Sequence, residues 1–169
     1  MIPTLFTPDL TLRAPVIGDF ELYAETCASP RASFIGGPMD REEAWYDLAS
    51  AVAGWVLQGF GYWTITDRKT TAILGWTGFG HLTTEPEPEL GWCTTPSAEG
   101  KGVAFAAASA ARDWCFETLN WSSVVSYIDP GNARSIALAQ RMGAVLDTTV
   151  TAADPKDLVY RHHKPGGQP

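Results

Sequence analysis

The sequence predicts a single α/β domain in which strands and helices alternate along the chain. Three observations support this prediction. The chain has 169 residues, enough to bury a core without disulfides or metals. Segments of strand-like composition are separated by segments with helical spacing of apolar residues. A glycine-rich turn at residues 99–104 joins a predicted strand to a long alanine-rich helix. We place the domain at residues 1–164 and expect residues 165–169 to form a flexible C-terminal tail.

The first part of the chain predicts a strand and two helices. Residues 10–14 alternate apolar and polar side chains, which is typical of a strand, and residues 19–27 predict a short helix. Asp40 with Glu43 three residues later is typical of a capping box and predicts the start of a longer helix, which Gly59 and Gly61 end.

One face of this longer helix carries apolar side chains at helical spacing, which we expect to pack in the core: Trp45, Leu48, Val52, Trp55 and Val56. An alternative role is open for three aromatic residues of the same helix, which could line a substrate entrance: Trp45, Tyr46 and Trp55.

The middle of the chain predicts a β-hairpin followed by a further strand. Residues 62–66 and 72–82 favour extended structure and are joined by a turn at residues 67–71. Gly75, Gly78 and Gly80 interrupt the second strand and indicate bulges or a ligand that passes close to the backbone. After a proline-rich turn, residues 89–95 predict the next strand, with the odd-numbered residues on one face.

Residues 99–104, Glu-Gly-Lys-Gly-Val-Ala, predict an anion-binding turn at the start of a helix over 103–119. Backbone N–H groups at a helix N-terminus favour a negatively charged ligand such as a diphosphate, and the two glycines let it approach. Simple turn formation is the alternative. A Walker loop is excluded because Lys101 is followed by Gly102, and a dinucleotide fingerprint is excluded because Phe105 stands where a small residue is needed.

The last part of the chain predicts a strand at residues 122–128, a short helix at 133–142 and two closing strands at 145–151 and 158–163, which form a hairpin. Asn132 precedes the short helix, and Gly143 is suited to the C′ position at its end. His162 and His163 form no metal-binding set with other residues, so no metal is expected.

The composition excludes several classes of function. A net charge of -7 gives no basic surface for nucleic acid or an anionic membrane and instead favours a cationic substrate. Cys27, Cys93 and Cys115 are widely spaced, which indicates buried thiols and neither a disulfide framework nor a zinc site. The N-terminus lacks the pattern of a signal peptide, so we expect a cytoplasmic protein.

Two motifs in the second half carry a resemblance to a known family. In the glycine turn, Gly102 and Ala104 match the pattern Arg or Gln, two residues, Gly, one residue, Gly or Ala. The second motif is the segment 132–144, which begins with Asn and ends in Met-Gly-Ala. In this order they resemble the GNAT superfamily of acyl-CoA N-acetyltransferases. The opening Leu-Thr-Leu-Arg at 10–13 and the spacing of Asn132 and Ser135 resemble more narrowly the RimJ/RimL branch, which includes acetyltransferases of ribosomal-protein N-termini.

The resemblance implies a mixed, mostly antiparallel sheet with helices on both faces, acetyl-CoA as cosubstrate, and a primary amine as acceptor. It places the cofactor against eleven residues of the strand end, the cradle and the following motif: Cys93, Thr94, Thr95, Glu99, Gly100, Lys101, Gly102, Val103, Ala104, Asn132 and Ser135. The oxyanion donor is expected to be a main-chain N–H near Cys93 or Thr94. Lys101, Arg134 and Arg141 are candidates for contacts to phosphates. Relatives are monomers or homodimers.

The chain departs from the family pattern at two positions. Glu99 stands where Arg or Gln is expected, which places a negative charge beside the diphosphate and is expected to reduce its affinity. Ala139 stands where many members have a tyrosine general acid, so Ser135 is the candidate that protonates or hydrogen-bonds the CoA sulfur.

Transfer to an amine also needs a base. Glu89 is the first candidate, with a solvated carboxylate as the alternative interpretation, and His81 is the second candidate. Asn132 is expected to orient the pantetheine or a water, or to cap its helix, or both. Cys93 as a covalent nucleophile is disfavoured, because no His lies near it in the sequence.

The acceptor is expected to be a protein or peptide N-terminus. A small-molecule amine, such as a polyamine, amino acid or antibiotic, is the alternative. A non-catalytic CoA-binding regulatory module is a further hypothesis, motivated by Glu99 and Ala139.

Overall fold

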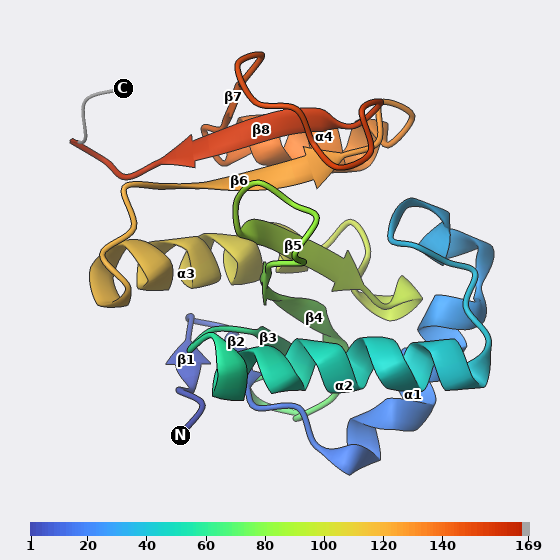
Figure 1. Cartoon of the computed structure of the whole chain (residues 1–169). Coiled ribbons are helices and arrows are strands. Elements are labelled where there is room, and N and C mark those ends of the chain that lie inside the picture. The colour runs from blue at the N-terminus through green and yellow to red at the C-terminus, as the bar shows by residue number, and fades with distance from the viewer. Residues whose placement is uncertain (167–169) are drawn as a thin grey trace.

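The computed structural model describes residues 1–166 and contains an eight-stranded sheet (Figure 1). The strand order is β1-β2-β3-β4-β5-β6-β8-β7, and every neighbouring pair is antiparallel except β5 and β6. The strands are β1 (Leu5–Phe6), β2 (Leu10–Arg13), β3 (Tyr62–Asp67), β4 (Ile73–Gly80), β5 (Glu89–Thr94), β6 (Ser123–Ile128), β7 (Val145–Leu146) and β8 (Leu158–His163). The predicted mixed, mostly antiparallel α/β sheet is confirmed.

Helices cover both faces of this sheet (Figure 1). α1 (Phe20–Ala28) and α2 (Arg41–Leu57) pack together on one face, and α3 (Val103–Thr118) lies on the other face, where it contacts β2, β4 and β5. α4 (Ala133–Arg141) packs against β6 and β8. Short 3-10 helices form η1 (Ile17–Asp19), η2 (Pro30–Phe34) and η3 (Pro96–Ala98).

Local sequence signals set the helix ends. The Asp40 carboxylate accepts hydrogen bonds from the backbone N–H groups of Glu42 and Glu43, at 2.8 and 2.9 Å, so the predicted capping box is confirmed. Gly59 and Gly143 have φ of +83°, the left-handed conformation that ends α2 and α4.

The core lies between the sheet and α3. Ala107, Ala108 and Ala111 are fully buried, and their small side chains let α3 lie close to the strands. Beneath them Trp63, Phe79 and Trp114 form an aromatic cluster in which the Trp63 and Trp114 rings cross edge to face, with centroids 5.2 Å apart. The tryptophan-rich composition is therefore explained mainly by this core.

The decisive irregularity of the sheet is the pairing of β5 with β6. β4 pairs with β5 over its length, from Gly75 opposite Thr94 to Gly80 opposite Glu89. β5 and β6 are instead in register only at Glu89 opposite Val125, so the two parallel strands separate towards Thr94. This separation opens the sheet at the strand that leads into the glycine turn.

Three predictions of the fold need correction. Trp45 is 43% exposed and Val56 is 85% exposed, because the fully buried face of α2 is formed by Ala44 and the predicted Leu48. The strand predicted at 145–151 ends at Leu146, because the Asp147 carboxylate accepts the Thr149 N–H and turns the chain. β1 was not predicted from the sequence.

Two expectations concern the ends and the surface of the chain. The tail predicted at 165–169 lies largely outside the described residues. Within residues 1–166, no helix combines the length and the apolar composition needed to cross a membrane.

Candidate functional site

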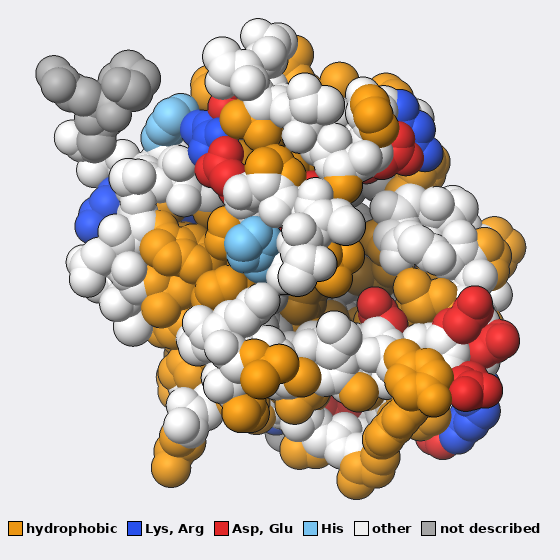
Figure 2. Space-filling view, viewed as in Figure 1, with side chains coloured by type: hydrophobic (Ala, Val, Ile, Leu, Met, Phe, Trp, Pro, Cys, Tyr) orange, Lys and Arg blue, Asp and Glu red, His pale blue; other side chains and the backbone are white. Residues whose placement is uncertain are grey.

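Two cavities meet beside the separation of β5 from β6. The first, here called the cradle groove, has a volume of about 1040 Å³ and extends over the glycine turn and α4. The second, here called the β5 cavity, has a volume of about 480 Å³ and lies between β5 and the helices α1 and α2. In Figure 2 the surface is hollowed between α2 and strands β6 and β8. The two cavities share Phe34, Ile35, Trp92, Cys93, Asn132 and Ser135.

The glycine turn forms an open wall of the cradle groove. Gly100 and Gly102 have φ of +72° and +76°, and a Cβ on either would meet no atom within 4 Å, so the space above them is free. Gly102 is the N-cap of α3, and among residues 1–166 no side chain caps this helix end. The first backbone N–H groups of α3 are thus available to a bound anion.

Four charged side chains surround this wall. Glu99 forms ion pairs with Arg31, at 2.7 Å, and with Arg134, and these three residues line the groove. Arg141 also lines it and lies over the Phe105 ring, 4.2 Å from the centroid. The negative charge of Glu99 is therefore balanced by two guanidinium groups. The open turn and the excess of cations fit a phosphate-bearing cofactor.

Predicted cofactor residues divide into two groups. Most line the cradle groove: Cys93, Thr94, Glu99, Gly100, Gly102, Val103, Ala104, Asn132 and Ser135. Lys101 and Thr95 do not line it. Lys101 is exposed, and Thr95 is buried with its hydroxyl 3.3 Å from the Leu74 carbonyl.

Main-chain N–H groups of β5 face the gap between the strands. The Thr95 N–H donates to Leu74 on β4, whereas the Leu90 carbonyl accepts the Ser126 hydroxyl from β6 at 2.7 Å. Since successive residues of a strand direct their backbone groups to opposite sides, the N–H groups of Trp92 and Thr94 face the side of β6. β5 is in register with β6 only at Glu89 opposite Val125, so these N–H groups face the opening between the two strands.

Ser135 lies at the same junction. Its hydroxyl oxygen accepts a hydrogen bond from the Trp92 indole N–H at 3.2 Å, which leaves the hydroxyl proton free to be donated elsewhere. The Asn132 carboxamide oxygen accepts the Ser135 backbone N–H, also at 3.2 Å, and so caps α4. The predicted capping role of Asn132 is confirmed.

Glu89 lines the β5 cavity, and the pKa of its carboxyl is raised into the neutral range. Burial raises the pKa of its carboxyl to about 7, the Glu85 and Asp157 carboxylates add to the shift, and a hydrogen bond with the Tyr127 backbone opposes it. At neutral pH this carboxyl can therefore both accept and release a proton.

The charge of the β5 cavity is opposite to that of the cradle groove. Four carboxylates line the cavity, those of Asp47, Glu85, Glu89 and Asp157, and within residues 1–166 its lining contains no Lys or Arg. A cationic molecule is thus favoured in the β5 cavity and an anionic one in the cradle groove.

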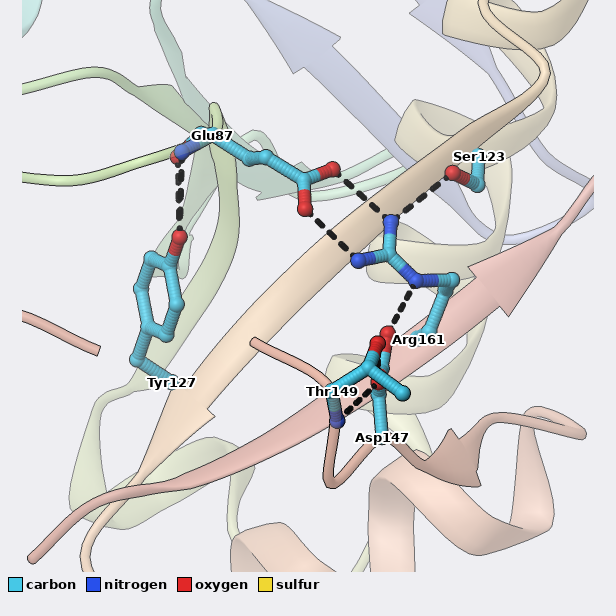
Figure 3. Close-up of polar contacts among 6 residues, drawn as sticks. All are labelled: Glu87, Ser123, Tyr127, Asp147, Thr149 and Arg161. Atoms are coloured by element: carbon cyan, nitrogen blue, oxygen red, sulfur yellow. Dashed lines mark hydrogen bonds and ion pairs between the residues drawn. The ribbon is translucent and has the colours of Figure 1, made fainter. Parts of the chain in front are cut away.

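An ion-pair network holds the segment that leads into Glu89 (Figure 3). The Arg161 guanidinium donates to both Glu87 oxygens, at 2.6 and 2.8 Å, and to Asp147 at 2.6 Å. The Tyr127 hydroxyl lies 3.2 Å from the Glu87 backbone nitrogen and carbonyl oxygen. The guanidinium lowers the pKa of the Glu87 carboxyl. These contacts fix the position of Glu87 and so restrict the backbone that leads to Glu89, two residues further on.

Other candidates from the sequence have defined positions. His81 lines the β5 cavity, with its Nε2 3.2 Å from the Glu85 carbonyl oxygen. His162 is 1% exposed, and burial lowers its pKa to about 4, so it is neutral. Burial raises the pKa of the Cys93 thiol to about 11, which disfavours the thiolate that a nucleophile requires. The three cysteines are free thiols, of which Cys27 and Cys115 are buried, as predicted, whereas Cys93 is partly exposed at the cavity.

Sequence reasoning missed several residues that line the site. Arg31, Tyr62, Asp47 and Asp157 come from segments without any recognisable motif. Their convergence depends on tertiary packing. The one available signal was the set of glycines in β4, Gly75, Gly78 and Gly80, which indicated bulges or a ligand that passes close to the backbone.

Comparisons with known proteins agree with this geometry. A family model described as an acetyltransferase (GNAT) domain matches residues 9–145. The structure is similar to the crystal structure of the acetyltransferase from Agrobacterium tumefaciens str. C58, with 43% identity, a TM-score of 0.94, and 97% of this chain and 96% of that chain covered. The uncharacterized protein YkkB of Bacillus subtilis (strain 168) is 28% identical over 104 residues, so the match spans 60% of each protein.

Two more distant structures share the fold. Spermidine N-acetyltransferase from Vibrio cholerae, in complex with CoA and spermine, has 18% identity, a TM-score of 0.72 and coverage of 92% of this chain and 94% of that chain. Ribosomal-protein-S5-alanine acetyltransferase from Vibrio fischeri has 16% identity, a TM-score of 0.73 and coverage of 99% and 100%.

Proposed function

This chain belongs to the GNAT acetyltransferases, whose cosubstrate is acetyl-CoA, and on that premise we propose that it acetylates a primary amine bound in the β5 cavity. The observation that carries the proposal is the position of Glu89. Its carboxyl, with a pKa near 7, lies in an acidic cavity that meets the cradle groove at Trp92, Cys93 and Ser135.

In this proposal acetyl-CoA supplies an activated acetyl thioester, and the residues of the chain divide the remaining tasks. Glu89 takes a proton from the acceptor ammonium, directly or through a water, so that the amine becomes nucleophilic. The N–H groups of Trp92 and Thr94 donate to the carbonyl oxygen as negative charge develops on it. The Ser135 hydroxyl donates its free proton towards the departing sulfur.

The cofactor assignment rests on the cradle groove. Gly100, Gly102 and the first turn of α3 offer backbone N–H groups to a diphosphate, while Arg31, Arg134 and Arg141 supply positive charge for phosphates. The expectation that Glu99 reduces the affinity for acetyl-CoA stays a prediction. The ion pairs of Glu99 with Arg31 and Arg134 offset its charge and argue against a large reduction.

The acceptor class is the finer part of the proposal. The RimJ/RimL resemblance favours a protein or peptide N-terminus, and structures of a ribosomal-protein acetyltransferase and a spermidine acetyltransferase share this fold. The four carboxylates of the β5 cavity and the absence of Lys and Arg from its described lining support an amine that is cationic in solution. Of the two classes, we therefore favour a small cationic amine. We expect the protein to act as a monomer or homodimer.

The test combines cofactor binding with transfer. Saturation with acetyl-CoA at 100 times its Kd adds about 2.7 kcal/mol and raises Tm by about 5–10 °C, whereas NADH and ATP leave Tm unchanged. Thiol release in the presence of an amine rises as pH passes through about 7, and Glu89→Gln abolishes this rise. Glu117→Gln, an exposed carboxylate on α3, is the matched control.

Two outcomes contradict the proposal. Acetyl-CoA binding without transfer to any primary amine would favour the non-catalytic CoA-binding module. Full turnover with an unchanged pH profile in Glu89→Gln would remove Glu89 as the base, leaving His81 or water.

A further inference from the structure

The floor of the β5 cavity contains a feature that the proposed function does not use. Tyr62 on β3, Gly78 on β4 and Gly91 on β5 stand opposite one another in the sheet register, so they share one face of the sheet, and Tyr62 and Gly91 line the cavity. Two glycines side by side leave the backbone of β4 and β5 without side chains at this point, and the Tyr62 ring occupies the space.

The fit of this ring is close. A Cβ on Gly91 would overlap the Tyr62 hydroxyl oxygen and lie 3.2 Å from Cζ, so the hydroxyl rests on the Gly91 backbone. Gly91 must therefore be glycine if the ring is to keep this position. A phenol held against β5 in this way has little freedom to move.

The position of the hydroxyl on β5 gives it chemical neighbours. On the face of β5 that carries Gly91, the flanking residues are Glu89 on one side and Cys93 on the other. Glu89 is the proposed base, and Cys93 belongs to the junction with the cradle groove. The hydroxyl thus lies between the group that deprotonates the amine and the place where the acetyl group arrives.

The hydroxyl is also available. Within residues 1–166, the Tyr62 side chain forms no hydrogen bond, and only the Tyr62 carbonyl is used, by the Trp55 indole. Burial, and then the Glu89 and Asp47 carboxylates, raise the pKa of the phenol well above its ordinary value. The phenol remains protonated and neutral throughout the working pH range.

We propose that Tyr62 is a catalytic residue whose hydroxyl oxygen accepts a hydrogen bond from an N–H of the acceptor amine and directs its lone pair at the thioester carbon. This inference rests on the proposed function. The nitrogen gains positive charge as its bond to carbon forms and the carbon–sulfur bond breaks, so its N–H becomes a stronger donor. The hydrogen bond is then strongest in the transition state. Because Glu89 has already taken the ammonium proton, the second proton that the nitrogen loses passes through the Ser135 hydroxyl to the departing sulfur.

The test uses a probe that does not require the natural acceptor. A conjugate of CoA in which the sulfur carries CH₂–CO–NH–butyl places an N–H at the position of transfer, and unmodified CoA is the reference ligand. Calorimetry gives the ratio of the two Kd values for each protein. Tyr62→Phe, which removes one oxygen atom, is expected to weaken the conjugate about 10-fold and leave CoA unchanged.

Gly91→Ala supplies a second route to the same hydroxyl. The added Cβ displaces the Tyr62 hydroxyl, so this variant is expected to lose the same preference for the conjugate. The double variant Tyr62→Phe with Gly91→Ala should lose no more than either single variant, because both act on one contact. Tyr46→Phe is the control that keeps the wild-type ratio, because Tyr46 is exposed on α2 and, contrary to the alternative drawn from the sequence, is not among the described residues that line either cavity.

The outcomes separate this inference from the function on which it rests. An unchanged ratio of conjugate to CoA in Tyr62→Phe overturns the role of Tyr62 while acetyl transfer stands. Failure of the wild-type protein to bind either ligand overturns the cofactor assignment, and with it the proposed function. A loss of CoA binding in Tyr62→Phe equal to the loss of conjugate binding would show a structural role and also overturn the inference.

Discussion

Glu89, the proposed base, is also expected to affect the stability of the protein. The carboxyl is buried beside Glu85 and Asp157, and its pKa of about 7 lies above the ordinary value of 4.5. In the unfolded chain the same carboxyl ionises near 4.5, so between the two values the folded protein holds a proton that the unfolded chain has released. Stability therefore falls as pH rises through this window, and the full loss is present above about pH 7.

The Glu89→Gln variant should remove this loss, because glutamine does not ionise. Between pH 4 and pH 8 we expect the stability of Glu89→Gln relative to the wild-type protein to rise by about 3 kcal/mol. Any other effect of the substitution is the same at both pH values. Urea unfolding at several pH values measures the difference. Glu117→Gln should show no such trend, and a flat difference for Glu89→Gln would place the Glu89 pKa near its ordinary value.

At the scale of elements, glycine in the turn before α3 can be required for two reasons: the backbone conformation and the binding of the cofactor. Gly102 and Gly143 both have left-handed φ, +76° and +83°, and neither has an atom within 4 Å of a built Cβ. They differ in place, since Gly102 lines the cradle groove and Gly143 follows α4 away from it. The two glycines therefore form a matched pair.

We predict that Gly102→Ala and Gly143→Ala each lower stability by about 1 kcal/mol, because alanine is strained at positive φ. Only Gly102→Ala should also weaken acetyl-CoA, by about 10-fold or more, because its methyl group enters the space above the turn. Thermal unfolding with and without acetyl-CoA reports both effects. Equal ligand shifts in the two variants would show that the turn does not contact the cofactor.

Elements of the fold were largely readable from the sequence, because each has a local signal. The capping box at Asp40, the glycine at 143 and the alternation in residues 89–95 depend on neighbours in the chain, and the structure confirms them. The prediction that Val56 packs in the core was wrong, because helical spacing identifies an apolar stripe but does not show which of its residues are buried. β7 was predicted too long because β-branched residues favour a strand even where Asp147 forms a turn.

The site was predictable only where it follows from such local signals. Gly102, Asn132 and Ser135 belong to motifs with fixed spacing, and Glu89 begins a strand. Arg31 and Tyr62 reach the site through packing of distant segments, which no spacing in the sequence encodes. The ion pairs of Glu99 with Arg31 and Arg134 also depend on tertiary packing. The motif alone suggests that the Glu99 charge is unfavourable, whereas the folded structure places two guanidinium groups beside it.

At the scale of the whole molecule, charge is divided between the two cavities. The net charge of -7 hides this division, because the cradle groove carries Arg31, Arg134 and Arg141 while the β5 cavity carries only acidic groups among its charged lining residues within 1–166. Under the proposed function, opposite charges at adjoining cavities favour an anionic cofactor in one and a cationic acceptor in the other. The two cavities meet at Trp92 and Ser135.

This division predicts an order among acceptors of equal length. Diaminobutane, aminobutanol and aminobutanoate share one reacting amine and differ only in the charge at the other end. We expect kcat/KM to fall in that order, with a step of about 5-fold or more between the first two at low ionic strength, and the differences to shrink in 0.5 M salt, where the Debye length is only about 4 Å. Acetyl transfer measured by thiol release gives all three values.

A substitution at Asp47 tests whether the charge preference arises in the β5 cavity. Asp47 lies on α2, lines the exposed side of this cavity and accepts a hydrogen bond from the Tyr23 hydroxyl. It is remote in sequence from Glu89. Asp47→Asn should lower kcat/KM for diaminobutane towards the value for aminobutanol and leave aminobutanol itself unchanged, since only the first has a second cation. A preference for aminobutanoate, or an equal loss for all three amines, would contradict the electrostatic argument, because neither can arise from attraction between a second ammonium group and an acidic cavity.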